Sequence, residues 1–283
     1  MLHTTHNTYI VPYKVLLSND DSLDVYPYIR TLDATNHKMY LVSPEHGRSY
    51  VVDRRSNRYV VSKGNGLSYT CHTFINTGEL GNDTWGLLLK QDAFRDFIIG
   101  NEVRGLGIKT NHMEYVLELD TYITLNNGTH LKPILLQYSV ECPYRISDSA
   151  YMTQDEINYW ADMWHTMFPY NHKYRYQIAT EVLIKNLRTL EDNGILHNAM
   201  TCQNYTWALE LLDFEIAHSP NYPYNSEDAQ RHVMDLFTRE IIFTYQIIIS
   251  IAGRLREPID YAWIDRMFNH YGYDIGIYGI KIK

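Results

Sequence analysis

The chain has 283 residues, of which 45% are hydrophobic and 20% charged, so it can bury a core as one two-lobed domain or as two small domains. Its formal net charge of −8 excludes the basic footprint of a nucleic-acid-binding protein, and an anionic nucleotide would need a local basic pocket or a metal ion. Cys71, Cys142 and Cys202 lie far apart without metal-ligand spacing, which favours a reducing compartment, and we expect a cytoplasmic protein.

Strand patterns dominate the first half of the sequence. Residues 11–17 predict a strand and residues 23–32 a short helix after an Asp-Asp-Ser capping signal, within an N-terminal addition that packs on the first lobe. Further strands are predicted at residues 38–42, 49–53 and 58–62, the last two joined by a hairpin turn.

The strand at 58–62 leads into Lys63-Gly64-Asn65-Gly66. A lysine at a strand end can reach phosphate oxygens, and glycines let the backbone approach a ligand closely. Lys63, Gly64 and Gly66 are therefore candidates for binding a nucleotide, with a surface lysine beside a turn as the alternative.

A helix is expected next, at residues 88–105. Its predicted core face consists of Phe94, Phe97, Ile98 and Leu106. Strand patterns return at 115–119, 122–125 and 131–138, with a turn at 126–129, and the irregular segment 139–149 is the expected hinge. This division predicts a β-rich first lobe over residues 1–138 and a helical second lobe over residues 139–283.

The second half is predicted to be helical. Thr153 and Glu156 form a capping-box pattern before a helix that continues to residue 168. A long amphipathic helix follows at 174–191, with Ile178, Val182, Leu183, Leu187 and Leu190 on one face. Helices at 226–254 and 258–270 close the chain, and the apolar stretch 241–252 is too short and too mixed to span a bilayer, so we expect no membrane partner.

The stretch at 194–217 carries the chemistry that the rest of the chain would support. Asn204 offers an amide oxygen and Asp213 a carboxylate, and the hairpin-length segment between them could fold one onto the other. Mg²⁺ prefers oxygen ligands and usually takes only one or two carboxylates, completing its shell with phosphates and water. The pattern therefore predicts a magnesium site for phosphoryl or nucleotidyl transfer.

This stretch resembles the catalytic loop and metal motif of protein kinases. His197, Asn204 and Asp213-Phe214 stand at the positions of the kinase His, Asn and Asp-Phe, whereas Ala199 replaces the catalytic Asp and Glu215 the final Gly. The same missing Asp marks the selenoprotein O family, kinase-fold enzymes that transfer AMP to proteins. Lys63-Gly64-Asn65-Gly66, a polar stretch at 68–84, a helix and then Leu106-Gly107-Ile108-Lys109-Thr110 follow the order of blocks in that family.

The resemblance implies an α+β, two-lobed protein-kinase-like fold that binds ATP and Mg²⁺. Lys63 would hold phosphates, Asn204 and Asp213 would bind Mg²⁺, and Arg145 would contact a phosphate or form a hinge salt bridge. The family glutamate that orients the lysine falls on Asn101, and we expect neighbouring Glu102 to take its role.

Two positions of the loop bear on catalysis itself. The residue at the place of the family's candidate base is Gln203, whose amide cannot accept a proton as a carboxylate does. Either the transfer needs no general base, or Glu215 or Asp192 substitutes, or catalysis is weak. His197 is expected to organise the loop through packing and hydrogen bonds, with a catalytic role as the alternative.

Three functions remain open from the sequence. We favour transfer of AMP to hydroxyls of an unidentified protein substrate, ahead of phosphate transfer. The second hypothesis is a pseudokinase that acts as a binding module, which Ala199 and Gln203 favour. The third is a small-molecule kinase, which the loss of the catalytic Asp disfavours.

Overall fold

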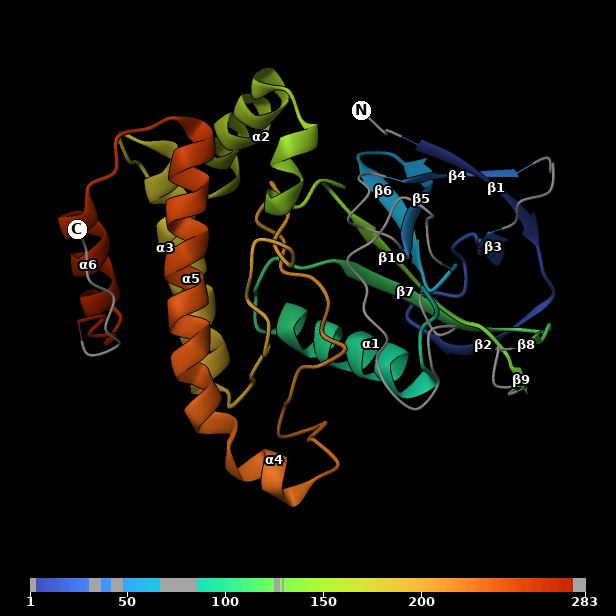
Figure 1. Cartoon of the computed structure of the whole chain (residues 1–283). Helices are drawn as coiled ribbons and strands as arrows, with labels where there is room; N and C mark the ends of the chain where they lie inside the picture. Colours follow the sequence, from blue (N-terminus) through green and yellow to red (C-terminus); the bar gives the residue numbers. More distant parts are fainter. Residues whose placement is uncertain are drawn as a thin grey trace. The chain divides into compact units, whose positions relative to one another are not determined.

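The computed structural model describes residues 4–30, 37–41, 48–66, 86–124, 128 and 130–276. The chain divides into two compact units (Figure 1). Unit 1 comprises Met1–Asn101 and Asn111–Pro143, and unit 2 comprises Glu102–Thr110 and Tyr144–Lys283. The polar segment at 68–84, Cys71 and most of the turn at 126–129 lie outside the described residues.

Unit 1 is organised around an eight-stranded antiparallel sheet with the order β2-β7-β10-β6-β5-β4-β1-β3. Its strands are β1 (Thr4–Ile10), β2 (Tyr13–Ser18), β3 (Tyr28–Arg30), β4 (His37–Leu41), β5 (Ser49–Arg55), β6 (Arg58–Lys63), β7 (His112–Leu119) and β10 (Ile134–Val140). A separate two-stranded ladder joins β8 (Ile123–Thr124) to β9 (His130–Leu131).

The central strands of this sheet form the core of unit 1. Every residue of β10 is buried, and six of the eight residues of β7 are. Such nearly continuous burial is expected for strands whose two faces are both covered. The β6–β10 register places Lys63 opposite Leu136, so the candidate lysine leaves the sheet near its centre.

The N-terminal residues join the sheet itself. β2 forms one edge beside β7, whereas β1 and β3 extend the opposite edge. The helix predicted at 23–32 is wrong, because residues 28–30 form β3 and pair with residues 8–10 of β1. Pro27 also disfavours helical geometry in the residue before it, so the capping signal has no helix to begin.

Helix α1 (Lys90–Gly105) carries an acidic side chain on its buried face. Ala93, Asp96, Phe97 and Val103 are buried at helical spacing, whereas Phe94 and Ile98 are only half-buried. The expected core face at Phe94, Phe97, Ile98 and Leu106 is therefore only partly correct. The buried face of α1 includes Asp96. Hydrophobic periodicity alone would not place a charged residue on that face.

Unit 2 is helical. Its elements are the 3-10 helix η3 (Ile146–Tyr151), α2 (Gln154–Met167), α3 (Arg175–Asp192), α4 (Glu227–Arg231), α5 (Val233–Leu255) and α6 (Tyr261–His270). The capping box is confirmed, since the Thr153 side chain accepts a hydrogen bond from the Glu156 backbone and the Glu156 carboxylate accepts one from Thr153.

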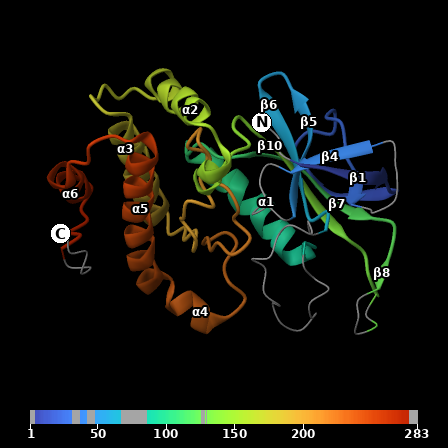
Figure 2. The same cartoon turned by 45° about the horizontal axis from the view of Figure 1, so that its top comes forward.

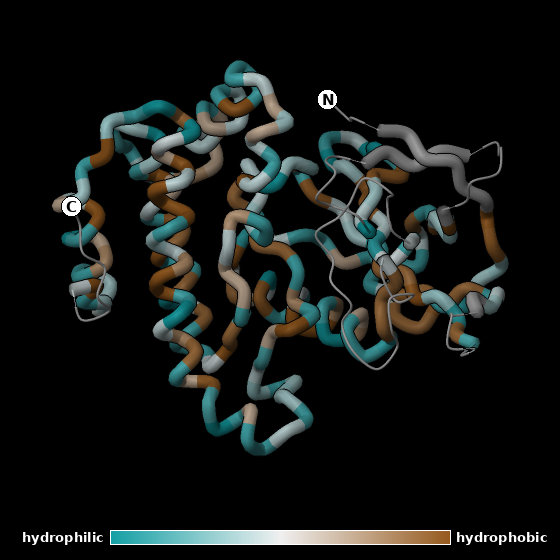
Figure 3. Tube along the Cα trace, in the orientation of Figure 1, coloured by the Kyte–Doolittle hydropathy of each residue, from teal (hydrophilic) through white to brown (hydrophobic). Residues whose placement is uncertain are grey.

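Helices α3 and α5 run side by side in Figures 1 and 2. The predicted apolar face of α3 is confirmed, because all five of its residues are buried, and Figure 3 shows hydrophobic segments along both helices. Among the described helices, α5 is long and apolar enough to cross a membrane by length and composition alone. Half of its apolar stretch is buried inside the protein.

The α+β class expected from the sequence is confirmed: one unit is β-rich and built on an antiparallel sheet, and the other is helical. The chain passes into unit 2 after Pro143, and the last turn of α1 also belongs to unit 2.

Candidate functional site

A buried ion pair lies at the end of β6. The Nζ of Lys63 is 2.9 Å from Oδ2 of Asp96 on α1, and the two side chains are only 2% and 1% exposed. Removing two charges from water is costly unless they are paired with good geometry, so burial of this pair fixes the lysine on the inner face of α1. The lysine predicted from the sequence is thus held by a carboxylate of the following helix.

That carboxylate is not Glu102, so the predicted pairing needs correction. Six residues separate Asp96 from Glu102, which places Glu102 about 9 Å further along the helix and on another face. The Oε1 of Glu102 instead accepts a hydrogen bond of 2.7 Å from Nδ2 of Asn221, within unit 2. Asn101, at the family's position, exchanges hydrogen bonds with Asn19.

The glycines after Lys63 have two distinct structural roles. Gly64 has φ +101°, and a Cβ atom there would lie 2.4 Å from the carbonyl oxygen of Ile134, so the backbone of β10 approaches too closely for any side chain. Gly66 has φ +97° but open space at the corresponding position, and its N–H donates to Gly86 at 2.8 Å. Gly64 therefore packs against the sheet, whereas Gly66 leaves room at the backbone.

The stretch at 194–217 folds back on itself in unit 2. Its ends meet through reciprocal backbone hydrogen bonds of 2.9 and 2.8 Å between Leu196 and His218. Inside, the N–H of Leu212 donates to the carbonyl of Asn204 at 2.9 Å, and Tyr205 bridges Leu211. The structure thus brings the two predicted metal ligands, at 204 and 213, to neighbouring backbone positions, as the hairpin-length interval indicated.

His197 is enclosed within this loop. It is 1% exposed, its Nε2 lies 2.8 Å from the Leu212 carbonyl, and its Nδ1 accepts a hydrogen bond from the Ala199 N–H. These contacts assign the neutral tautomer with the proton on Nε2. The ring also packs edge-on against Phe214 at 5.0 Å between centroids. His197 therefore links the two halves of the loop, which is the organising role expected from the sequence.

The side chain of Asn204 is oriented by a hydrogen bond within the loop. Its Nδ2 donates to the Ala199 carbonyl at 2.9 Å, and its backbone is fixed by Thr201 and Leu212. With the amide nitrogen engaged, Oδ1 is the atom of this side chain that can coordinate a cation. This is the donor that a hard cation requires.

Asp213 has a strained backbone. Its φ of +69° lies in the left-handed region, which non-glycine residues enter only when the surrounding structure fixes them. Carboxylate oxygens of Asp213 and Glu215 lie within 4.8 Å of each other. Two carboxylates and the Asn204 amide oxygen are a donor set suited to Mg²⁺, so the residues present fit the predicted ion.

The remaining predicted residues lie apart from these contacts. Gln203 is exposed, and its backbone N–H donates to Thr201. Arg145 begins η3, where its N–H donates to Asp148 at 2.6 Å, and among the described residues its guanidinium forms no ion pair. The hinge salt bridge considered for Arg145 is therefore not seen in the described part of the chain.

Glu240 of α5 anchors the same loop and was not predicted from the sequence. Its carboxylate is fully buried, and its two oxygens lie 3.5 and 3.3 Å from the N–H of Met200. Beside it on α5, Arg239 donates to the carbonyl of Asn198 at 3.2 Å. Glu240 shares helical spacing with Phe237 and Thr244, which are also buried, but the sequence alone does not separate it from a solvated carboxylate.

Glu240 gives the protein a testable pH dependence. Burial raises its pKa from 4.5 to about 7, with the Met200 N–H and Arg239 opposing that rise. The unfolded carboxyl loses its proton near pH 4.5, whereas the folded one keeps it to about pH 7, so stability falls as pH rises between these values. The loss should reach on the order of 3 kcal/mol above pH 7.

We expect Glu240→Gln to remove this loss, because an amide stays neutral and still accepts the Met200 N–H. Urea unfolding at pH 5 and pH 8, followed by tryptophan fluorescence, measures the effect. Asp235→Asn, at an exposed carboxylate of the same helix, is the control and should keep the wild-type pH difference. A Glu240→Gln protein with an unchanged pH difference would contradict the assignment.

Comparison with known proteins adds a distant structural likeness. No protein-family model and no curated protein sequence matches the chain. Among solved structures, the chain is similar to the crystal structure of Toxoplasma gondii specific rhoptry antigen kinase domain, at 12% sequence identity and a TM-score of 0.37. The match covers 82% of this chain and 71% of that one. A likeness this distant identifies no activity.

Proposed function

We propose that the chain is an ATP- and Mg²⁺-dependent transferase that moves AMP to hydroxyl groups of a protein substrate. The observation that carries the proposal is the buried Lys63–Asp96 pair. Active protein kinases require an ion pair between a strand lysine and a carboxylate on the next helix, because it holds the lysine on the nucleotide phosphates. Lys63 at the end of β6 and Asp96 on α1 have the same relationship, with a side chain one methylene shorter.

The proposed roles follow from the donors at each position. Lys63 would contact phosphate oxygens, and Arg145 is a second cation for them. Asn204 and Asp213 would hold Mg²⁺, which neutralises phosphate charge when it is bound. In the transfer itself, a hydroxyl oxygen bonds to the α-phosphorus, the bond from that phosphorus to the bridging oxygen breaks, and pyrophosphate leaves while the hydroxyl proton passes to solvent.

The choice of AMP over phosphate rests on the position that lacks a base. A kinase of ordinary type uses a loop aspartate to accept the substrate proton, and Ala199 offers no group there. Gln203 cannot replace it, since an exposed amide does not accept a proton at neutral pH. The same two residues favour the second candidate, a pseudokinase that binds nucleotide or protein without turnover.

Nucleotide binding gives the first test. We expect ATP with Mg²⁺ to raise the melting temperature of the full chain, since a ligand at a hundredfold excess over its Kd stabilises the folded state by about 2.7 kcal/mol. A thermal-shift titration, repeated with EDTA to remove Mg²⁺, measures the effect. A flat response at millimolar ATP would overturn the transferase and leave only a pseudokinase that binds protein.

Labelled ATP separates the outcomes for catalysis. The protein is incubated alone and with a cell lysate, using ATP marked on the α-phosphate in one reaction and on the γ-phosphate in the other. AMP transfer places only the α-label on protein. Transfer of the γ-label alone would identify a divergent kinase, and binding without either label would support the pseudokinase.

A further inference from the structure

Residues 19–28, here called the N-terminal strap, run from the end of β2 to the first residue of β3 in unit 1. The strap is held by polar groups of the sheet rather than by apolar packing alone. Tyr115 donates its hydroxyl to the carbonyls of Asp20 and Leu23, at 2.7 and 2.8 Å. These contacts define where the strap runs across β7.

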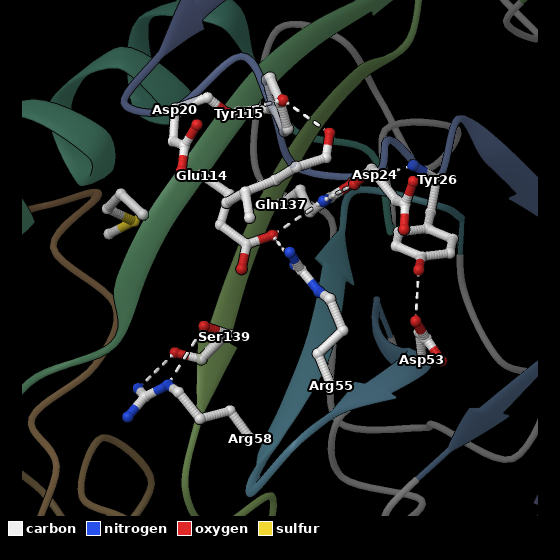
Figure 4. Close-up of polar contacts among 12 residues, drawn as sticks. Asp20, Asp24, Tyr26, Asp53, Arg55, Arg58, Glu114, Tyr115, Gln137 and Ser139 are labelled. Carbon is white, nitrogen blue, oxygen red and sulfur yellow. Dashed lines mark hydrogen bonds and ion pairs between the residues drawn. The ribbon is translucent and has the colours of Figure 1, made fainter.

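Gln137 of β10 holds the middle of the strap. Its Nε2 donates to the Asp24 carbonyl at 2.8 Å, and its Oε1 accepts the Tyr26 N–H at 3.0 Å. The same Nε2 donates to Glu114, which also pairs with Arg55 of β5. Figure 4 shows these side chains converging beneath the strap. Gln137 and Glu114 are buried, so this network fixes the strap in one register on the sheet.

The first end of the strap reaches α1. Asn19 donates from Nδ2 to Oδ1 of Asn101 at 2.8 Å, and Asn101 returns a hydrogen bond of 3.1 Å to Oδ1 of Asn19. Asn19 is itself fixed to β7, through its N–H on the Glu114 carbonyl and its Nδ2 on the Met113 carbonyl. This amide pair therefore ties α1 to the sheet five residues after Asp96.

The other end reaches the segment that follows Lys63. Nδ2 of Asn65, two residues beyond the lysine, donates to the Tyr28 carbonyl, and the Asn65 side chain is fully buried. A single segment thus contacts both elements whose alignment makes the Lys63–Asp96 pair. All of these residues belong to unit 1.

We infer that the N-terminal strap is a positioning element for the nucleotide site: by holding Asn101 of α1 and Asn65 after β6, it keeps Asp96 against Lys63. This inference rests on the proposed function for its biological meaning, but the positioning can be measured without nucleotide. When the strap contact to α1 is lost, α1 separates from β6 more often and Lys63 becomes accessible. Strap residues therefore control the site without touching it.

The test follows the reactivity of the Lys63 amine in the full chain. The protein is treated briefly with an acetylating N-hydroxysuccinimide ester, and the acetylation rate of each lysine is read by mass spectrometry. Exposed Lys185 of α3 is the internal reference. Asn19→Ala and Asn101→Ala should each raise the Lys63 rate about fivefold relative to Lys185, the change expected for loss of one typical hydrogen-bonded contact.

A double variant and a control variant test whether the effect comes from the Asn19–Asn101 pair. The double variant should react little faster than the faster single variant, because both substitutions remove the same amide pair. Ser22→Ala is the matched control and should leave the Lys63 rate unchanged, since among the described residues the hydrogen bonds of Ser22 go to Asp20 within the strap. Asp96→Asn removes the ion pair directly, so it should give the highest Lys63 acetylation rate of the series.

The outcomes are distinct. Equal Lys63 rates in wild type and both asparagine variants would overturn the inference, as would a uniform rise at all lysines, which reports general loosening. A selective rise at Lys63 supports it. If wild type shows no thermal shift with ATP while the selective rise persists, the proposed function fails and the positioning role stands.

Discussion

Asp96→Ala is expected to lower the free energy of unfolding by about 3–5 kcal/mol, because it breaks a buried ion pair by removing one of its charges. The pair is 2% and 1% exposed, so water cannot take the place of the Asp96 carboxylate without local opening. Urea denaturation followed by circular dichroism measures the change.

Removing both charges provides the control for this effect. Lys63→Met with Asp96→Leu replaces the pair by apolar side chains of similar size and should recover most of the lost stability, since a buried pair contributes little net free energy. A loss below about 1 kcal/mol for Asp96→Ala would place the pair in the range of exposed salt bridges. The double variant should nevertheless lose the ATP-dependent thermal shift.

Glu102 was favoured because the resemblance places the family glutamate at neighbouring Asn101, and nothing in the helix pattern pointed to Asp96. Hydrophobic periodicity assigns charged residues to the outer face of a helix, yet Asp96 lies within the buried stripe formed with Ala93, Phe97 and Val103. Only a buried cation on another element makes this arrangement stable, and Lys63 lies 33 residues away. A spacing rule within one helix carries no information about such a partner.

The sequence correctly predicted those features whose stabilising contacts are local. The capping box at Thr153, the hairpin of β5 and β6 and the apolar face of α3 depend on neighbours within a few residues or on helical spacing. The helix expected at 23–32 failed because long-range pairing with β1 outweighed a capping signal.

The stretch at 194–217 was predicted only in part. Its hairpin interval predicted that Asn204 and Asp213 would come together, and the Leu212–Asn204 hydrogen bond brings them there. The anchor at Glu240 escaped prediction, because a carboxylate next to an isoleucine-rich stretch is indistinguishable from a solvated one until the Met200 N–H is placed against it. The strained φ of Asp213 is likewise a property of the folded loop.

Asp213→Ala is expected to abolish transfer activity, with a loss on the order of a hundredfold or more, as for removal of one preorganised charge-stabilising group. Asp213→Asn tests the charge alone, because asparagine tolerates the left-handed backbone that Asp213 adopts. Single-turnover assays with α-labelled ATP measure the rate, and thermal unfolding checks that each variant is folded.

His197→Ala is the matched variant in the same loop, and it separates metal binding from loop structure. Its Nε2 contacts the Leu212 carbonyl and its ring packs on Phe214, so truncation leaves a buried acceptor unpaired and opens a cavity. We expect it to cost about 2–4 kcal/mol of stability while much of the transfer rate survives in the folded fraction at low temperature. Wild-type turnover by Asp213→Asn would remove Asp213 from the metal site, and loss of turnover by a fully folded His197→Ala protein would give the histidine a direct role in catalysis.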